Sequence, residues 1–132
     1  INSGFSGQSY VDFGSDETSY IEWDNVDVKE GEYELIFRYA NGGRDPRPLR
    51  IYINAVSTDV VAFESTDKRW HLWKHTKSAP LSLHQGTNTI RLRVAGDAGG
   101  PNLDQMIILP LGADPNDPVI LSDLATPAPT TR

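Results

Sequence analysis

The residues whose chemistry is easiest to foresee in this chain are two tryptophans. Trp70 and Trp73 lie three residues apart in a segment that favours a strand, and an odd separation puts two side chains on opposite faces of a strand. One indole can therefore be buried while the other is exposed. An exposed indole is a rigid apolar plate that can stack on the apolar face of a sugar ring at little cost in ordering entropy. The alternative is that both rings are buried, with a bulge or loop that breaks the alternation.

Polar groups with binding chemistry follow a glycine-rich turn late in the chain. The run 99–104 reads Gly-Gly-Pro-Asn-Leu-Asp, so Asn102 and Asp104 share one face of the strand that this turn opens. The amide suits recognition of hydroxyl groups, and the carboxylate suits calcium ligation. The alternative for both side chains is an Asx contact that only stabilises the turn.

Arginines and histidines elsewhere carry less specific signals. Arg44, Arg47 and Arg50 follow an Asn-Gly-Gly turn and form a candidate patch for a carboxylate-bearing ligand, although pairing with nearby acids is the commoner fate of an arginine. His71 and His75 have the four-residue spacing of a zinc pair on a helix. Their segment favours a strand, however, and this predicts a solvated strand face rather than a metal site.

Signatures of catalysis are absent from the sequence. It has no Gly-x-Ser-x-Gly elbow, no phosphate loop and no dinucleotide fingerprint. It also has no cysteine, which excludes disulfides, thiolate metal sites and a cysteine nucleophile. Carboxylates are dense between residues 12 and 30, and two of them could act across a cleft as in glycosidases. Dense surface carboxylates more often serve solvation or calcium binding, so we expect no enzyme.

The elements that must position these groups are short strands. Apolar and polar residues alternate over Glu32–Ala40, Leu49–Ile53 and Thr89–Val94, and prolines and glycines interrupt every candidate helix. Weaker strands are predicted at Ser9–Phe13, Ser19–Asp27, Asp59–Phe63, Trp70–His75 and Leu103–Leu109. This many strands in one domain predicts an all-β fold, a β-sandwich.

Length and net charge restrict the number of domains and the class of partner. The 132 residues are one domain's worth, and a net charge of −6 disfavours nucleic acid and anionic membranes as partners. No stretch approaches the roughly 20 apolar residues of a membrane span. The polar start at Ile1 is typical of a mature or excised segment. Composition changes after Pro110, which predicts a sandwich over 1–110 and a C-terminal tail or linker over 111–132.

An ordered set of short motifs resembles carbohydrate-binding module family 35 and, more loosely, family 6, from about Gly4 to Leu109. In chain order the motifs are Gly4-Phe5-Ser6-Gly7, Tyr10-Val11-Asp12-Phe13, Tyr20-Ile21-Glu22-Trp23, Arg38-Tyr39-Ala40-Asn41-Gly42, Thr66 with Trp70 and Trp73, Gly86-Thr87-Asn88-Thr89-Ile90-Arg91-Leu92, and Gly100-Pro101-Asn102-Leu103-Asp104. The resemblance implies an antiparallel, jelly-roll-like β-sandwich that is not catalytic. It also implies a module that targets an attached glycan-active enzyme to polysaccharide.

The same resemblance implies a binding site in the loops at one end of the sandwich. Asn102 matches the asparagine at the floor of that site, and Trp73 matches the stacking tryptophan, with Trp70 in a more structural role. Tyr10 is the expected second aromatic wall. Arg44 is the candidate for a recurring arginine contact to sugar or uronate, with Arg47 behind it.

The resemblance also implies a structural calcium ion, for which Asp104 is the matching acidic ligand. Family members supply further ligands from a Glu-x-Glu strand, which would precede Ile1. The expected partners are a polysaccharide or oligosaccharide and the linked catalytic domain of a larger enzyme, with neither nucleic acid nor membrane, and the expected location is secreted and extracellular. Two alternatives stay open: a small β-sandwich polysaccharide lyase or hydrolase, and a structural or adhesion module in which Trp73 is buried.

Overall fold

The computed structural model describes residues 11–12, 20–113 and 130–131 of the chain. These residues contain no helix that is long and apolar enough to cross a membrane. Strands are the only regular secondary structure of these residues. They are β1 (Val11–Asp12), β2 (Tyr20–Val28), β3 (Gly31–Ala40), β4 (Leu49–Ile53), β5 (Val56–Val61), β6 (Lys74–Lys77), β7 (Leu81–Leu83), β8 (Gly86–Val94), β9 (Asn102–Pro110) and β10 (Thr130–Thr131).

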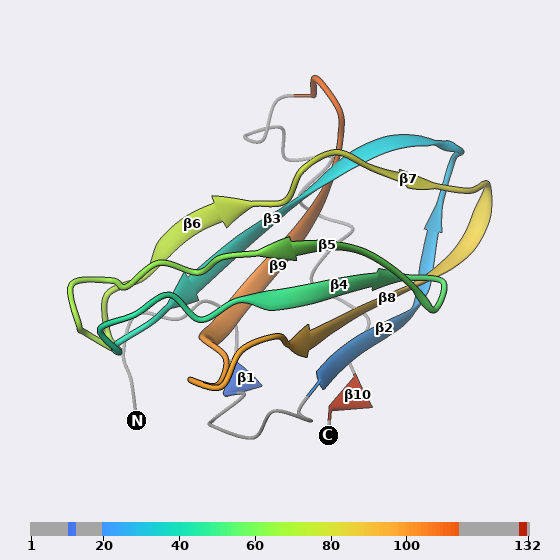
Figure 1. The fold of residues 1–132 in the computed structure, drawn as a ribbon. Helices are drawn as coiled ribbons and strands as arrows, with labels where there is room; N and C mark the ends of the chain where they lie inside the picture. The colour runs from blue at the N-terminus through green and yellow to red at the C-terminus, as the bar shows by residue number, and fades with distance from the viewer. Residues whose placement is uncertain (1–10, 13–19, 114–129, 132) are drawn as a thin grey trace.

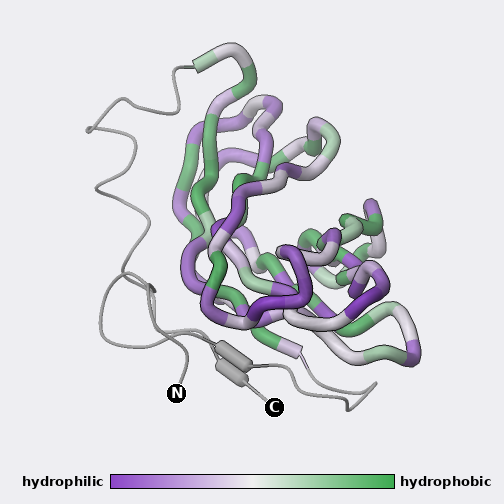
Figure 2. The backbone as a smooth tube through the Cα atoms, turned by 90° about the vertical axis from the view of Figure 1, so that its left-hand side faces the viewer, coloured by the Kyte–Doolittle hydropathy of each residue, from purple (hydrophilic) through white to green (hydrophobic). Residues whose placement is uncertain are grey.

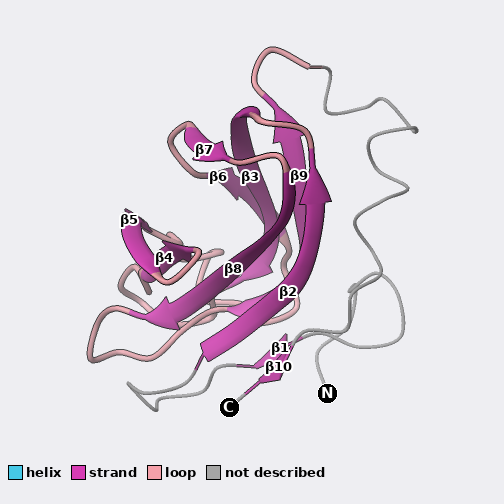
Figure 3. Ribbon diagram, turned by 90° about the vertical axis from the view of Figure 1, so that its right-hand side faces the viewer, coloured by secondary structure: helices cyan, strands magenta, loops and turns pink. Residues whose placement is uncertain are grey.

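The strands make two antiparallel sheets that pack face to face (Figures 1 and 3). Sheet A has the order β1-β9-β3-β6, and β7 pairs with the same edge of β3 as β6 does. Sheet B has the order β10-β2-β8-β4-β5. The structure thus confirms the predicted all-β sandwich. Its central strands, β3 and β9 in one sheet and β2 and β8 in the other, are the long ones that the sequence pattern marks.

The core lies between the sheets and follows from the alternation along each strand (Figure 2). In β3 every second residue faces inward, and Leu35 and Phe37 are fully buried. Sheet B contributes fully buried side chains that include Ile51 and Leu92. Phe63, which lies beyond β5, places its ring edge-on against the Phe37 ring, with centroids 5.3 Å apart. Burial of these side chains from both sheets is what holds the sandwich closed.

One predicted strand is wrong, and two strands, β7 and β10, are missing from the sequence analysis. The segment predicted as a strand over Trp70–His75 is a loop as far as Trp73, and β6 begins at Lys74. The chain turns sharply ahead of the tryptophans because Asp67 and Lys68 both have positive φ, which ends regular strand geometry. The missed strands, β7 and β10, have too few residues for a recognisable alternation.

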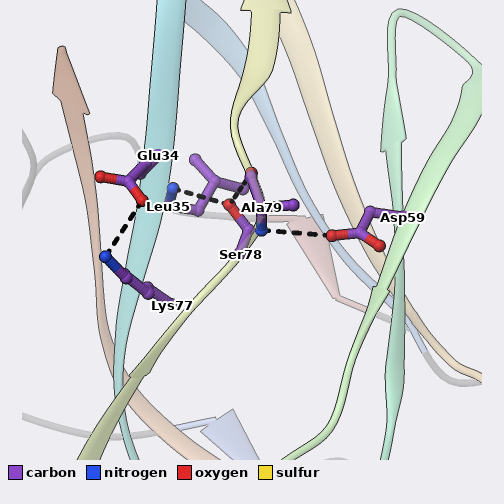
Figure 4. Close-up of polar contacts among 6 residues, drawn as sticks. All are labelled: Glu34, Leu35, Asp59, Lys77, Ser78 and Ala79. Atoms are coloured by element: carbon purple, nitrogen blue, oxygen red, sulfur yellow. Dashed lines mark hydrogen bonds and ion pairs between the residues drawn. The ribbon is translucent and has the colours of Figure 1, made fainter. Parts of the chain in front are cut away.

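The junction between β6 and β7 ties the two sheets together at their edge (Figure 4). The backbone NH of Leu35 donates to Ser78 Oγ at 3.0 Å, so a side chain takes the place of a backbone acceptor where β3 changes partner. The next backbone NH, of Ala79, donates to Asp59 Oδ2 in sheet B at 3.3 Å. On the outer face beside this junction, Lys77 Nζ pairs with Glu34 Oε2 at 3.2 Å. These contacts fix the C-terminal end of β6, where the chain passes to β7, at the opposite end of β6 from the tryptophans.

The predicted division of the chain near Pro110 stays a prediction, because most of 111–132 lies outside the described residues. Within the described part, β9 ends at Pro110 and Thr130–Thr131 pair with Glu22 and Ile21 of β2. Part of the segment predicted as a tail therefore adds an edge strand to sheet B.

Candidate functional site

Three loops converge at one end of sheet A, over residues 41–48, 62–73 and 95–101, and we call these loops together with the adjoining ends of β3 and β9 the loop end. Ala40, the last residue of β3, pairs with Asn102, the first residue of β9. On the other side of β3, Tyr39 pairs with Lys74, the first residue of β6. The loops that follow β3 and precede β6 and β9 therefore leave the sheet at neighbouring points.

Asn41 and Thr66 hold the first two loops together. The backbone NH of Asn41 donates to Thr66 Oγ1 at 3.1 Å, and the backbone NH of Thr66 donates to the Asn41 carbonyl at 2.8 Å. The Asn41 side chain donates to the Phe63 carbonyl at 2.8 Å and accepts from the Gly43 NH at 3.0 Å. Both side chains are fully buried and fully bonded. A buried network with its donors and acceptors satisfied makes these loops a rigid frame.

Tyr39 holds the second loop, residues 62–73, to the core. Its hydroxyl donates to the carbonyl of Glu64 at 3.0 Å, and its ring packs edge-on against Phe63. Burial raises the pKa of the Tyr39 phenol, and the negative charge of Glu64 raises it further, while the hydrogen bond to the Glu64 backbone acts in the opposite direction. The phenol therefore stays protonated, and keeps its bond to the loop, to a higher pH than a tyrosine in water.

Trp70 lies against the glycine turn and under an arginine. A Cβ on Gly42 would overlap the indole of Trp70, so only glycine leaves room for the ring. The Arg47 guanidinium lies 4.9 Å from the centre of the same ring, and its Nη1 donates to the Gly100 carbonyl at 3.2 Å. Arg47 thus joins the first loop to the third, and Trp70 is packed between them, in keeping with its expected structural role.

Trp73 lies on the outer face of sheet A with Arg38 beside it. The Arg38 guanidinium is 5.2 Å from the centre of the indole, and its Nη1 pairs with Asp104 Oδ2 at 2.6 Å. The Asp104 side chain is completely buried. Trp73 itself is partly exposed, which disagrees with the structural or adhesion alternative in which it is buried. Sequence analysis missed Arg38 as a site residue, although its outward position on the strand beside Asp104 is the signal that could have found it.

Asn102 is 2% exposed, and its amide has an unusual environment. The other buried polar side chains of the described residues, Asn41, Thr66, Ser78 and Asn88, all make hydrogen bonds. In that same part of the chain the Asn102 amide makes none. Its neighbours across the strands are Asp12 and Ala40. On the other side of β3, Tyr39 pairs with Lys74, the residue that follows Trp73. An amide that makes no hydrogen bond among the described residues has its donor and its acceptor available to a ligand.

A buried polar atom lies at the same end of the sandwich. Arg47 Nε is buried and has no hydrogen-bond partner among the residues that the structure describes. Arg44, the arginine that the sequence analysis favoured, is exposed on the same loop and has no ion pair with any described residue. The structure therefore brings Trp73, Asn102 and Arg47 to one end of the sandwich. Tyr10 lies outside the described residues, so its place in the site stays a prediction.

Asp104 fits a calcium site only in part. Its carboxylate is already neutralised by Arg38, and the described residues bring together no group of three or more His, Cys, Asp or Glu side chains. A calcium ion at Asp104 would thus need ligands from outside the described residues and would compete with a guanidinium. The structural calcium stays a prediction.

Comparisons with known proteins agree with this geometry. The family model described as carbohydrate binding module (family 6) matches residues 3–108. A family 35 carbohydrate-binding module from Clostridium thermocellum is similar in structure, with a TM-score of 0.73 and 38% identity over 80% of this chain and 81% of that one. A family 35 module described in complex with a glucuronic acid containing disaccharide superimposes with a TM-score of 0.74 at 26% identity, covering 82% of this chain and 78% of that one.

Among curated proteins, the exo-beta-D-glucosaminidase of Amycolatopsis orientalis is 33% identical over 81% of this chain and 10% of its own length. The chain spans about a tenth of the length of the first curated relatives that it matches. Those relatives are large carbohydrate-active enzymes, and the match falls in a small part of each one.

Proposed function

The chain belongs to the carbohydrate-binding modules of family 35, within the wider family 6 group, and we propose that its loop end binds a glycan through Trp73 and Asn102. Membership of this family makes the domain a binding module, and this is what its sequence motifs predict. The residues that bind are the proposal, and it depends on the geometry of the loop end.

The observation that carries the proposal is the Asn102 amide, which makes no hydrogen bond among the described residues, at the same end of sheet A as the partly exposed indole of Trp73. Stacking a pyranose ring on the indole removes apolar surface of both from water. The Asn102 amide can both donate to and accept from the hydroxyl groups of that sugar. A flat apolar contact with a few fixed polar groups is the usual division of labour in small-ligand sites.

Arg47 supports the proposal as a partly exposed cation at the same end of the sandwich. Its guanidinium is fixed by Trp70 and by the Gly100 carbonyl, so little conformational entropy is lost when it contacts a ligand. A uronate carboxylate that reaches the guanidinium would form a charge-assisted hydrogen bond with it. Arg44 on the same loop is a second candidate for this contact, and the glucuronic acid containing disaccharide of a solved relative supports a uronate.

For the protein as a whole, we propose that this module targets an attached glycan-active enzyme to polysaccharide outside the cell. The relatives that contain a matching segment are glycoside-active enzymes, and the module is a small fraction of each.

We also propose calcium as a structural ion at Asp104, and this is tested separately. Added calcium should raise the melting temperature of the wild-type chain, and the Asp104→Asn variant should lose that rise. A melting temperature of the wild type that calcium leaves unchanged contradicts the proposal.

Retention of the protein in polysaccharide affinity gels tests the binding site. With glucuronoxylan, galactomannan or galactan in the gel, we expect at least one to retard the wild-type chain. Trp73→Ala should weaken that retardation about tenfold or more, because stacking is the main apolar contact. Asn102→Ala should weaken it as well, without lowering the melting temperature, because the amide makes no hydrogen bond within the described residues.

The matched control for this experiment is His71→Ala, which removes an exposed ring from the same loop. It should leave both retardation and melting temperature unchanged. Retardation that survives Trp73→Ala contradicts the site. A loss of retardation in the His71 control would show that the loop, not the indole, is being measured.

A further inference from the structure

Trp73, Arg38 and Asp104 form a row across the outer face of sheet A. β3 lies between β9 and β6, so Arg38 of β3 reaches Asp104 on one side and Trp73, the residue before β6, on the other. The Arg38 guanidinium is 5.2 Å from the centre of the Trp73 indole, and its Nη1 is 2.6 Å from Asp104 Oδ2. One guanidinium therefore contacts both the carboxylate and the ring.

The backbone of β9 has a β-bulge at this row. Tyr39 pairs with Leu103 and Arg38 pairs with Gln105, so β9 has one extra residue at this point, and that residue is Asp104. Bulges re-aim a side chain and are frequent beside functional sites. The regular ladder between β3 and β9 is thus interrupted where the carboxylate meets Arg38.

Asp104 holds Arg38 in place. The Asp104 side chain is completely buried, and the Arg38 side chain is 23% exposed. A buried carboxylate that loses its cation is strongly destabilised, so the guanidinium has little freedom to leave the pair. A guanidinium held in this way is a fixed planar group, and such a plane stacks well on an aromatic face. The Trp73 indole is therefore restrained by a group that is itself restrained.

The two tryptophans of the loop end are restrained in different ways. Trp70 lies against Gly42, where a Cβ would overlap the indole, so close packing fixes that ring. Trp73 is partly exposed, and exposed side chains change rotamer within picoseconds to nanoseconds unless a contact holds them. An aromatic ring that rotates before binding loses that freedom when a sugar stacks on it, which lowers the affinity. A contact that fixes the indole beforehand removes this cost.

We propose that Arg38 is a positioning residue for glycan binding, which holds the Trp73 indole in the orientation that stacks on the sugar, with Asp104 as its anchor. This rests on the proposed function, since Arg38 acts through the sugar contact of Trp73. The planar shape of the guanidinium is needed as well as its charge. An arginine that only neutralised Asp104 could be replaced by lysine without any effect on binding.

Arg38→Lys separates these two roles, because lysine keeps a positive charge for Asp104 but has no planar group for the indole. We expect its melting temperature to stay near that of the wild type. Its retardation by whichever of glucuronoxylan, galactomannan or galactan retards the wild type should weaken about fivefold, since a contact between a cation and an aromatic ring is lost. Arg38→Gln removes the charge too and should lower both quantities. Asp104 is left unchanged in this experiment, because it is also the proposed calcium ligand.

Fluorine NMR of the chain labelled with 5-fluorotryptophan reads the indole directly, without any ligand. The chain has three tryptophans, and the signal of Trp73 is assigned by its loss in Trp73→Phe. In Arg38→Lys the Trp73 signal should move toward the position of a mobile, solvated indole and become narrower. The signals of Trp23 and Trp70 should keep their positions. A salt bridge with a merely structural role would leave all three signals in place.

Arg91 supplies the matched control on sheet B. It pairs with Glu22, with Nε 2.9 Å from Oε1, and lies 4.2 Å from the centre of the Tyr20 ring, so it repeats the contacts of Arg38 away from the loop end. Arg91→Lys should leave the retardation and the tryptophan signals as in the wild type. Equal effects in the Arg38 and Arg91 variants overturn the proposal. So does a loss of binding in Arg38→Lys with an unchanged Trp73 signal, because Arg38 would then contact the ligand directly.

The failure of this proposal can be told from the failure of the loop-end site. If Trp73→Ala is retarded as the wild type is, or no polysaccharide retards the wild type, the loop-end site fails and the glycan role of Arg38 fails with it. The fluorine spectrum then still measures whether Arg38 restrains the indole. If Trp73→Ala loses retardation and Arg38→Lys keeps it in full, only the positioning role fails.

Discussion

The loop end and the outer face of sheet B both carry arginines, but the surroundings of those arginines differ. At the loop end, Arg38 is paired with a buried Asp104 and Arg47 is bonded to the Gly100 carbonyl, each beside a tryptophan. On sheet B, Arg50 and Arg93 lie opposite each other without a carboxylate among the described residues. The first region is held by contacts between loops and the second by strand register. Substitutions that break the contacts between loops should therefore lower both stability and binding, whereas substitutions on the outer face of sheet B should have little effect on stability.

The largest difference is expected between the two arginine–carboxylate pairs. Asp104→Asn removes the buried carboxylate that pairs with Arg38 and should lower the free energy of unfolding by about 2–3 kcal/mol. Glu22→Gln breaks the pair with Arg91, whose side chains are 38% and 19% exposed, and should cost less than about 1 kcal/mol. Urea unfolding followed by tryptophan fluorescence measures both values. Equal losses would remove the distinction between the two regions.

An intermediate effect is expected at the bond between loops. Thr66→Val leaves the buried backbone NH of Asn41 without its acceptor, which should cost about 1–3 kcal/mol. The same variant should also weaken glycan retardation, because the frame that carries Trp70 and Trp73 loosens. Thr89→Val, on the outward side of β8, is the matched control and should be near neutral, since valine is favoured in strands. If Thr66→Val kept full stability, the loop end would not depend on this bond.

The smallest effect is expected from pH. Because the Tyr39 pKa is raised in the folded chain, the unfolded chain releases the phenolic proton first as pH rises. The unfolded state then binds fewer protons than the folded one, so stability is complete below about pH 10, the ordinary tyrosine value, and falls as pH climbs through the folded pKa. Melting temperatures measured between neutral and strongly alkaline pH should decline less steeply in Tyr39→Phe. An identical decline would exclude Tyr39 as the source.

Strand alternation made much of the fold predictable. Leu49–Ile53 is a strand with the bounds that the pattern predicts, and β3, β8 and β9 differ from prediction only at their ends. The strand predicted over Trp70–His75 fails for a tertiary reason. The loop that carries Trp70 and Trp73 contains apolar residues at strand-like spacing, but Asp67 and Lys68 turn the backbone and bonds from Asn41 hold it. Such tertiary bonds leave no periodic signal in the sequence.

The candidate site was predictable in its residue types but not in its partners. Asn102, Asp104 and Trp73 were marked by local motifs, and the structure places all of them at one end of sheet A. The sequence analysis ranked Arg44 ahead of Arg47 by resemblance alone, because both follow the same glycine turn. The packing of Trp70 on Gly42 is what gives Arg47 its position.

The sequence alone determined the faces of the strands and the family of the fold, because a side-chain period of two and an ordered set of motifs are local properties of a chain. The tertiary structure decided which outward residues meet. Pairing of Arg38 with Asp104 and of Arg50 with Arg93 depends on which strands become neighbours and in what register. Those choices are made by the burial of a shared core and the closure of long loops, and no short stretch of sequence records them.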